Sequence, residues 1–232
     1  DELSDLLEGV DFIFHLAGVN RPKDDIEFVE GNIELTETLC HAIRRAGRLI
    51  PVIYTSSIQA EVDNPYGKSK LAAEKALLDF SKKTGSPVHR LPNVFGKWCK
   101  PNYNSAVATF CHNISHDLPI QINDPSACIR LVYIDDVVRR FISVMDGAIV
   151  DNGFCGVDPV YEITVGELVE KLTAYKASRD SLVVGRVGAG LDRALYSTYL
   201  SYLDAKQFSY ELLKHEDPRG VFVEMLKTQD SG

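Results

Sequence analysis

The stretch from Thr55 to Lys70 reads TSSIQAEVDNPYGKSK, and the rest of the chain is organised around it. An apolar run at 49–54 leads into it and predicts a buried strand that ends in the serines Ser56 and Ser57. The turn-forming residues 63–65 follow, and Pro65 suits the first turn of a helix because an N–H there has no partner. The stretch therefore predicts a strand, a short loop and a helix that begins near Tyr66.

Two side chains of this helix form a candidate proton-transfer pair. Tyr66 and Lys70 are four residues apart and share one helix face. A neighbouring ammonium favours the phenolate, so we expect the pKa of Tyr66 to be lowered toward neutral. Ser57 ends the preceding strand. Its hydroxyl can hydrogen-bond the substrate oxygen with which Tyr66 would exchange a proton. Tyr-x-x-x-Lys also arises by chance, as in Tyr202/Lys206 and Tyr210/Lys214, but neither of these follows a strand ending in serines.

Composition excludes several classes of protein. The 232 residues carry a net charge of −8, which argues against a nucleic-acid surface. No apolar run reaches the ~20 residues of a membrane span, and no signal peptide is expected. The five cysteines are scattered without a Cys-x-x-Cys, which indicates reduced thiols and neither a metal site nor a disulfide framework. We therefore expect a cytoplasmic protein with no nucleic-acid or membrane partner.

Strands and helices alternate from residue 10 to residue 91. Predicted strands lie at 10–18, 49–57 and 87–91, with helices at 31–47 and 66–83 between them. Such alternation predicts right-handed crossovers and a parallel sheet, the second half of a doubly wound α/β fold. The glycine-rich phosphate-binding turn of such folds is expected before residue 1, so the N-terminal half is expected to be missing. The glycine cluster at 185–190 is interpreted as a loop.

The strand, the Ser-Ser end and Tyr-x-x-x-Lys together resemble the extended short-chain dehydrogenase/reductases, the NAD-dependent epimerase/dehydratase family that modifies nucleotide sugars. The resemblance implies a Rossmann-like fold with a small substrate-binding subdomain. Tyr66 would be the catalytic acid/base, Lys70 would bind the nicotinamide ribose, and Ser57 would polarise the substrate carbonyl. The cofactor would also contact a further set of residues, namely Leu16, Ala17, Gly18, Ser56 and Pro92.

Substrate residues are expected after the third strand. The segment 97–105 combines the only tryptophan with lysines and amides, which suits a diphospho-sugar: stacking for the base, charge for phosphate, amides for hydroxyls. The alternative interpretation is a packed loop with solvated lysines. With the family's diphosphate-pairing arginine placed near Arg130, the expected substrate-binding set is Asn93, Trp98, Lys100, Asn102, Asn104 and Arg130.

A narrower resemblance rests on the short Ser57–Tyr66 loop and the run KWCKPNY at 97–103. Both are similar to the bacterial capsule and O-antigen reductases of UDP-N-acetyl-L-fucosamine synthesis. This implies reduction of a UDP-2-acetamido-2,6-dideoxy-4-hexulose by NADPH, or possible use of NADH, and a homodimer in the full-length form. Those enzymes continue into a zinc-binding cupin domain. The implied division is a partial Rossmann domain at 1–150, with a substrate loop inserted at about 92–130, a substrate-binding subdomain at 151–205, and a linker with the start of a cupin at 206–232.

Three alternatives differ in chemistry. A 4,6-dehydratase of the same fold needs an acid and a base after the serine position, where this chain has Ile58 and Gln59. An epimerase shares the Ser57, Tyr66 and Lys70 set and differs in net cofactor oxidation. A redox-inactive dinucleotide-binding scaffold usually loses the tyrosine or the lysine, and this chain keeps both.

Overall fold

The computed structural model describes residues 2–81, 84–151 and 153–228. The chain divides into two compact units, which are described separately. The first contains Asp1–Pro92 and Asp135–Pro159, and the second contains Asn93–Ile134 and Val160–Gly232. The segment expected as an inserted loop is therefore grouped with residues after 159.

The first unit is built on a parallel sheet with the strand order β1 (Ile13–His15), β2 (Val52–Ser57), β3 (Val88–Leu91) and β6 (Phe154–Cys155). Tyr54 of β2 pairs with Val88 of β3, and Val88 pairs in turn with Phe154 of β6. The carboxyl ends of β1 and β2 consequently lie at the same edge of the sheet. The predicted α/β class with a parallel sheet is confirmed.

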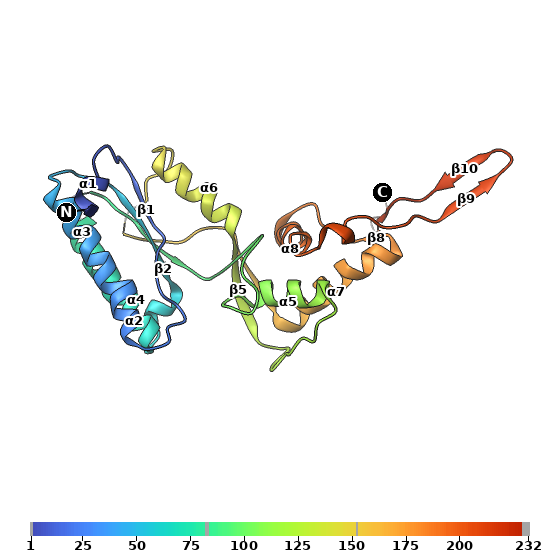
Figure 1. Cartoon of the computed structure of the whole chain (residues 1–232), viewed down its shortest axis with the longest axis horizontal. Coiled ribbons are helices and arrows are strands. Elements are labelled where there is room, and N and C mark those ends of the chain that lie inside the picture. The colour runs from blue at the N-terminus through green and yellow to red at the C-terminus, as the bar shows by residue number, and fades with distance from the viewer. Residues whose placement is uncertain (1, 82–83, 152, 229–232) are drawn as a thin grey trace. The chain divides into compact units, whose positions relative to one another are not determined.

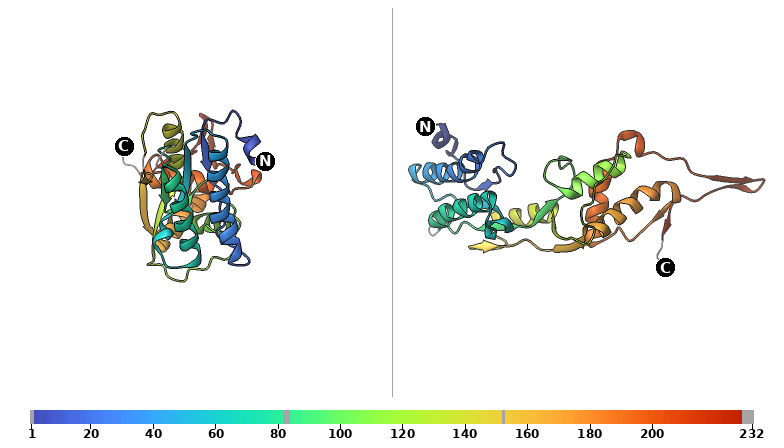
Figure 2. Two further views of the ribbon diagram at one scale, coloured as in Figure 1. Left: turned by 90° about the vertical axis from the view of Figure 1, so that its left-hand side faces the viewer. Right: turned by 90° about the horizontal axis from the view of Figure 1, so that it is seen from below.

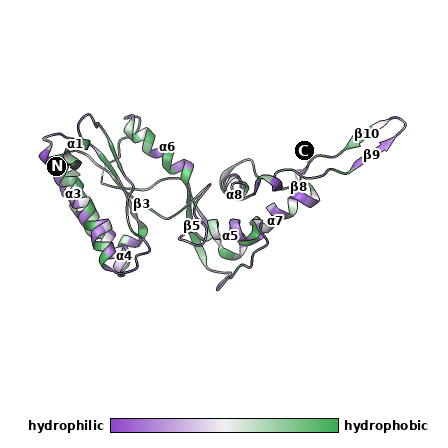
Figure 3. Ribbon diagram, in the orientation of Figure 1, coloured by the Kyte–Doolittle hydropathy of each residue, from purple (hydrophilic) through white to green (hydrophobic). Residues whose placement is uncertain are grey.

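Helices cover both faces of this sheet (Figure 1). Helices α3 (Leu35–Arg45) and α4 (Pro65–Ser81), with the short α1 (Glu2–Leu6), lie on the face that carries Tyr54 and Val88. Helix α6 (Ile134–Met145) packs on the other face, where Phe141 contacts Phe14 and His89. Colouring by hydropathy shows the mixed polar and apolar surfaces of these helices (Figure 3). The core between the sheet and α3/α4 contains Ile43, Val52, Ala73, Leu77 and Phe80.

The helix expected at 31–47 begins earlier and is not regular. It consists of α2 (Ile26–Phe28), a π-helical segment η1 (Val29–Glu34) and α3. The extra residue in a π-helical turn rotates the helix relative to the predicted pattern. Near its start the helix buries the polar residues Asn32 and Thr36, while Leu35 is 40% exposed. Further along, Ile43 is buried in the core and Leu39 packs against it.

The second unit has a mixed sheet. Strand β5 (Cys128–Tyr133) lies between β4 (Asn93–Phe95), to which it is parallel, and β7 (Val160–Thr164), to which it is antiparallel. Helices α5 (Ala106–Ser115), α7 (Val165–Ser181) and α8 (Gly190–Leu200) pack with this sheet around one core. The tyrosines Tyr199 and Tyr202 are buried in that core, so this tyrosine-rich segment serves packing. Residues 120–122 form no strand.

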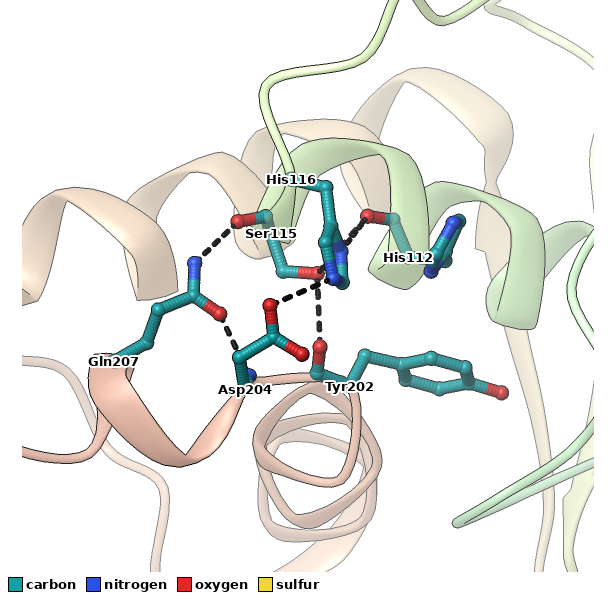
Figure 4. A network of polar contacts seen from close by, with 6 residues as sticks. All are labelled: His112, Ser115, His116, Tyr202, Asp204 and Gln207. Atoms are coloured by element: carbon teal, nitrogen blue, oxygen red, sulfur yellow. Dashed lines mark hydrogen bonds and ion pairs between the residues drawn. The ribbon is translucent and has the colours of Figure 1, made fainter.

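Helix boundaries in this unit follow sequence signals. Thr164 and Glu167 form the predicted capping box at the start of α7. The glycine cluster is a loop between β8 (Val183–Val184) and α8, as expected. A polar network joins the last turn of α5 to the 3₁₀ segment η3 (Ala205–Gln207): Gln207 donates to the carbonyl of Ser115, and His116 lies 3.6 Å from the carboxylate of Asp204 (Figure 4).

The end of the described chain forms a hairpin of β9 (Lys214–Asp217) and β10 (Gly220–Val223) that extends from the helices of its unit (Figure 2). Strand β11 (Lys227–Thr228) then pairs in parallel with β8. The hairpin agrees with the strands and turn expected there, and the assignment of 206–232 to a further domain stays a prediction.

Candidate active site

A short turn holds Ser57 against the start of α4. The Ser57 Oγ accepts a hydrogen bond from the Gln59 N–H at 3.1 Å and begins the 3₁₀ segment η2 (Ile58–Glu61). The Asn64 Oδ1 then accepts from the Gly67 N–H at 2.7 Å, which caps α4. A Cβ on Gly67 would lie 2.3 Å from the carbonyl oxygens of both Gln59 and Val62, so only glycine permits this approach. The turn and the helix are therefore in backbone contact.

Tyr66 and Lys70 both lie on the inner side of α4. Lys70 is buried, and its Nζ donates to the Thr55 carbonyl at 2.8 Å and sits 4.4 Å from the centre of the Tyr54 ring. Tyr66 is half-buried with its ring 5.8 Å from that of Phe28, and the Ser57 side chain is near enough to its hydroxyl to affect the Tyr66 pKa. The structure thus brings together the three residues predicted to be catalytic.

The expected lowering of the Tyr66 pKa is wrong for this structure. Burial raises the pKa of Tyr66, and the interaction with the Ser57 side chain opposes this only in part. The Lys70 ammonium donates to the Thr55 carbonyl and lies over the Tyr54 ring. It is therefore not directed at the Tyr66 phenol, whose pKa its positive charge was expected to lower. Burial also lowers the pKa of Lys70 to about 8, against the opposing charge of Glu74. At neutral pH the pair is therefore a protonated phenol beside a mostly protonated amine.

The buried side chain of Asn32 joins the loop after β1 to α4. Its Oδ1 accepts from the Val19 N–H at 2.8 Å, and its Nδ2 donates to the Val19 carbonyl at 2.9 Å and to the Ser69 Oγ at 2.9 Å. It holds the loop after β1 against α4, next to Lys70. The π-helical segment that carries Asn32 has no sequence signal that we could have used.

His15 and Thr36 complete the buried polar layer beneath Lys70. The His15 Nε2 lies 2.8 Å from the Thr36 Oγ1, and Thr36 donates to the Asn32 carbonyl at 2.7 Å. Burial, and to a lesser degree the charge of Lys70, lowers the pKa of His15 to about 4. This histidine is therefore neutral at physiological pH and its role is to support its neighbours.

The residues predicted to contact a dinucleotide fit one. Leu16, Ala17 and Gly18 are exposed at the carboxyl end of β1. A Cβ on Gly18 would lie 2.8 Å from the Asn32 Oδ1 and 3.5 Å from the Lys70 Nζ, so the bare backbone keeps this space open. Ser56 has a buried Oγ with no hydrogen-bond partner in the described part of the chain. Pro92 directly follows β3 and is the last residue of the segment Asp1–Pro92 of the first unit.

The predicted substrate residues all belong to the second unit. Asn93 donates to the Arg130 carbonyl at 3.0 Å, and the Arg130 side chain lies 3.3 Å from Glu162. Trp98 is 80% exposed with a φ of 61°. Lys100, Asn102 and Asn104 are also exposed. Exposure of Trp98 is unlike a packed side chain, whereas exposure of Lys100 agrees with both interpretations.

Backbone contacts hold the 97–104 loop in place while its side chains point outward. The Tyr202 hydroxyl donates to the Cys99 carbonyl, and the Ser201 Oγ accepts from the Trp98 N–H at 3.3 Å. The Asn102 N–H donates to the Thr109 Oγ1 at 3.0 Å. An anchored backbone with exposed aromatic, cationic and amide groups is a surface suited to ligand recognition.

Comparison with known proteins agrees with this geometry. The model of the NAD dependent epimerase/dehydratase family matches residues 1–152. The chain is 62% identical over 232 residues to the UDP-2-acetamido-2,6-beta-L-arabino-hexul-4-ose reductase of Pseudomonas aeruginosa, covering 99% of this chain and 62% of that protein. The chain thus spans less than two thirds of the length of this relative.

Solved structures give the same fold. The capsular polysaccharide assembling protein CapF from Staphylococcus aureus is 43% identical with a TM-score of 0.88, over 100% of this chain and 63% of that one. UDP-glucuronic acid 4-epimerase from Bacillus cereus is 19% identical with a TM-score of 0.73, over 90% and 78% of the two chains, and shows a common fold alone. Within the described residues, no helix has the length and apolar character needed to cross a membrane. The chain belongs to the NAD-dependent epimerase/dehydratase family.

Proposed function

We propose that this chain carries the reductase part of a nucleotide-sugar 4-keto reductase. Its substrate would be a UDP-2-acetamido-2,6-dideoxy-4-hexulose, in the synthesis of UDP-N-acetyl-L-fucosamine for capsule or O-antigen. The observation that carries the proposal is the 62% identity to the hexul-4-ose reductase across 99% of this chain. That likeness is far above the 19% shared with an epimerase of the same fold.

The protonation states of the site favour reduction. NADPH, when bound, supplies a hydride to the C4 carbonyl, and NADH remains the alternative donor. The reduced oxygen then needs a proton, and the raised pKa of Tyr66 keeps that proton on the phenol until it is required. Ser57 donates a hydrogen bond to the same oxygen as its negative charge develops. Lys70 holds the cofactor ribose through the donors that Thr55 does not use.

Cofactor placement depends on backbone as much as on side chains. Asn32 holds Val19 through both its N–H and its carbonyl, so the loop of Leu16, Ala17 and Gly18 is oriented before any ligand arrives. Such pre-organisation lowers the ordering cost of binding. Ser56 and Pro92 are proposed as further cofactor contacts.

The exposed residues of the second unit are proposed to hold the UDP-sugar. Trp98 offers an aromatic face for the uracil, and Lys100 a charge for the diphosphate. Asn93, Asn102 and Asn104 offer amides for hydroxyl groups, and Arg130 offers a second cation. Arg130 has its guanidinium beside Glu162, so a diphosphate would compete with that carboxylate. A homodimer and a cytoplasmic location form part of the same proposal and rest on the family resemblance.

Two other functions make different predictions. An epimerase would change the configuration of the sugar without net oxidation of cofactor. A redox-inactive scaffold would bind the dinucleotide and consume none, and such proteins usually lack the tyrosine or the lysine, both of which this chain keeps. Both alternatives are separated from a reductase by following the cofactor.

The test is an enzyme assay with NADPH and the UDP-4-keto sugar. It uses a form of this protein that is extended to the full length of the reductase relative. We expect one NADPH oxidised per sugar reduced, with a 4-hydroxyl product seen by NMR. Sugar conversion without loss of NADPH absorbance would indicate an epimerase. Binding of NADPH without any conversion, on a panel of UDP-4-keto sugars, would favour the scaffold.

A further inference from the structure

Arg90 forms a two-armed ion pair with a fully buried carboxylate of the catalytic helix. It lies on β3, with its side chain 20% exposed, and faces α4. Its Nε donates to Glu74 Oε1 at 2.9 Å and its Nη2 to Glu74 Oε2 at 2.7 Å. The Glu74 side chain is 0% exposed. Two parallel hydrogen bonds of this kind fix the orientation of the carboxylate as well as its distance from the guanidinium. The single ammonium group of a lysine cannot do both.

The third nitrogen of the same guanidinium reaches a different element. Arg90 Nη1 donates to Glu61 Oε1 at 2.6 Å, and Glu61 is the last residue of η2. The guanidinium also lies 4.1 Å from the centre of the ring of Phe154, a residue of β6. This cation–π contact helps to orient the guanidinium. Arg90 therefore connects η2 to α4, and its own position is fixed by the sheet to which it belongs.

The two connected carboxylates lie close in sequence to the catalytic residues. Glu61 ends the turn that Ser57 begins. Glu74 is one helical turn beyond Lys70, on the same face of α4. Backbone contact at Gly67 joins these elements at the start of α4, and the Arg90 contacts join them again further along the helix. Two separated points of contact restrict rotation of the helix against the turn, which one point cannot do.

We propose that Arg90 is a positioning residue for the reaction. By joining Glu61 to Glu74, it sets the distance between the Ser57 hydroxyl and the Tyr66 phenol and keeps the Glu74 carboxylate away from the Lys70 ammonium. This inference rests on the proposed function for its kinetic consequence, while its structural consequence can be measured without activity.

The electrostatic part of the proposal concerns Glu74. This carboxylate raises the pKa of Lys70 against the effect of burial. Arg90 occupies both oxygens of Glu74, so the Lys70 Nζ remains on the Thr55 carbonyl. Without Arg90, the buried carboxylate would be left unpaired one helical turn from the Lys70 ammonium. Because an unpaired buried charge is costly, we expect the two groups to move toward each other.

The protein offers a matched control in the same unit. Arg140 on α6 forms a similar fork, with its Nε 2.9 Å from Asp151 Oδ2 and its Nη2 on Asp151 Oδ1. The Asp151 side chain is 4% exposed, as buried a partner as Glu74. Arg140 belongs to α6, which packs on the opposite face of the sheet from α4. Arg140→Lys should therefore cost stability as Arg90→Lys does, but should leave the catalytic residues in place.

The experiment compares Arg90→Lys, Glu74→Gln and Arg140→Lys. Turnover is measured in the protein carried to the length of its relative, and the Lys70 side chain is titrated by NMR in this 232-residue chain. We expect Arg90→Lys to lower kcat by about 10²-fold with a much smaller change in KM, as a displaced catalytic group does. Arg140→Lys should lower thermal stability similarly and leave kcat unchanged. Glu74→Gln should lower the titration midpoint of Lys70 below the value of about 8 expected for the unchanged chain.

Each outcome decides one point. Equal kcat in Arg90→Lys and Arg140→Lys would overturn the positioning role, and an unchanged Lys70 midpoint in Glu74→Gln would overturn the electrostatic part. If Arg90→Lys does not fold, Glu61→Gln serves in its place, because Glu61 is 70% exposed and its loss leaves no buried charge unpaired. We expect a few-fold lower kcat there, and no change would overturn the proposal. If the unchanged protein does not reduce the sugar, the proposed function fails, while the Lys70 titration still tests the contacts of Glu74.

Discussion

The proposed catalytic residues and the proposed substrate residues are held in opposite ways. Ser57, Tyr66 and Lys70 belong to a buried or half-buried network in which side chains contact side chains and strand carbonyls. In the 97–104 loop the backbone is anchored, and Trp98 is 80% exposed. The buried network needs a single geometry for proton transfer, whereas the exposed loop can adapt to a ligand.

This difference has consequences for mutation. A change in the buried network should alter chemistry and stability together, because each member has several partners. A change to an exposed side chain should alter affinity for one ligand with little effect on stability. The predictions that follow separate these two kinds of behaviour, in the order of the expected effect.

Replacing Tyr66 by Phe should have the largest effect. The ring and its contact with Phe28 remain, while the proton donor is lost. We expect at least about a 10²-fold loss of kcat with NADPH affinity retained, measured by steady-state kinetics in the protein carried to the length of its relative. Tyr210→Phe, in one of the two other Tyr-x-x-x-Lys patterns, is the control and should be active. Activity of Tyr66→Phe within a few-fold of the unchanged protein would contradict its role.

Replacing Lys70 by Met should weaken both the rate and the cofactor affinity. The substitution removes the donor to the Thr55 carbonyl and the cation beside Tyr54, and it leaves a side chain of similar length. Fluorescence titration with NADPH measures the affinity, and Lys214→Met in the exposed strand β9 is the control. Unchanged cofactor affinity in Lys70→Met would show that the role given to Lys70 is wrong.

Replacing Trp98 by Ala should act on one substrate only. We expect KM for the UDP-sugar to rise by about tenfold, as loss of one stacking contact implies, with a smaller change for NADPH. Thermal stability should hardly change because the side chain is exposed, as in the control Leu118→Ala. An equal rise for both ligands, or a large loss of stability alone, would favour a packing role.

The buried network should also lose stability in mild acid. The pKa of His15 is lowered to about 4 from an ordinary value near 6.5, so the unfolded state binds more protons between these values. The contribution of neutral His15 is therefore complete above pH 6.5 and is lost as pH falls to 4 and below, by on the order of 3 kcal/mol in all. Urea unfolding of the unchanged chain and of His15→Asn across this range measures it. A His41→Asn control, at an exposed position, should keep the pH dependence of the unchanged chain. The same slope in His15→Asn would contradict the assignment.

The sequence predicted the parallel α/β arrangement and the Ser57, Tyr66 and Lys70 set because both depend on local patterns. Strand ends, turn residues and a four-residue spacing are visible in a short stretch. The π-helical segment around Asn32 was not predicted, since its polar contacts come from Val19 and Ser69, which are distant in sequence. The direction of the Tyr66 pKa was also wrong, because it depends on burial and on where Lys70 points. The contacts of Arg90 with Glu61 and Glu74 join three elements and leave no local signal.

The central claim is that hydride reaches C4 of the sugar while Tyr66 supplies the proton. The most direct measurement is a reaction of the protein, carried to the length of its relative, with NADPH deuterated at the transferred position. The account predicts a single deuterium at C4 of the reduced UDP-sugar, seen by NMR and mass spectrometry, and almost none formed by Tyr66→Phe in the same time. Converted sugar that carries no deuterium, or deuterium at another carbon, would contradict the account.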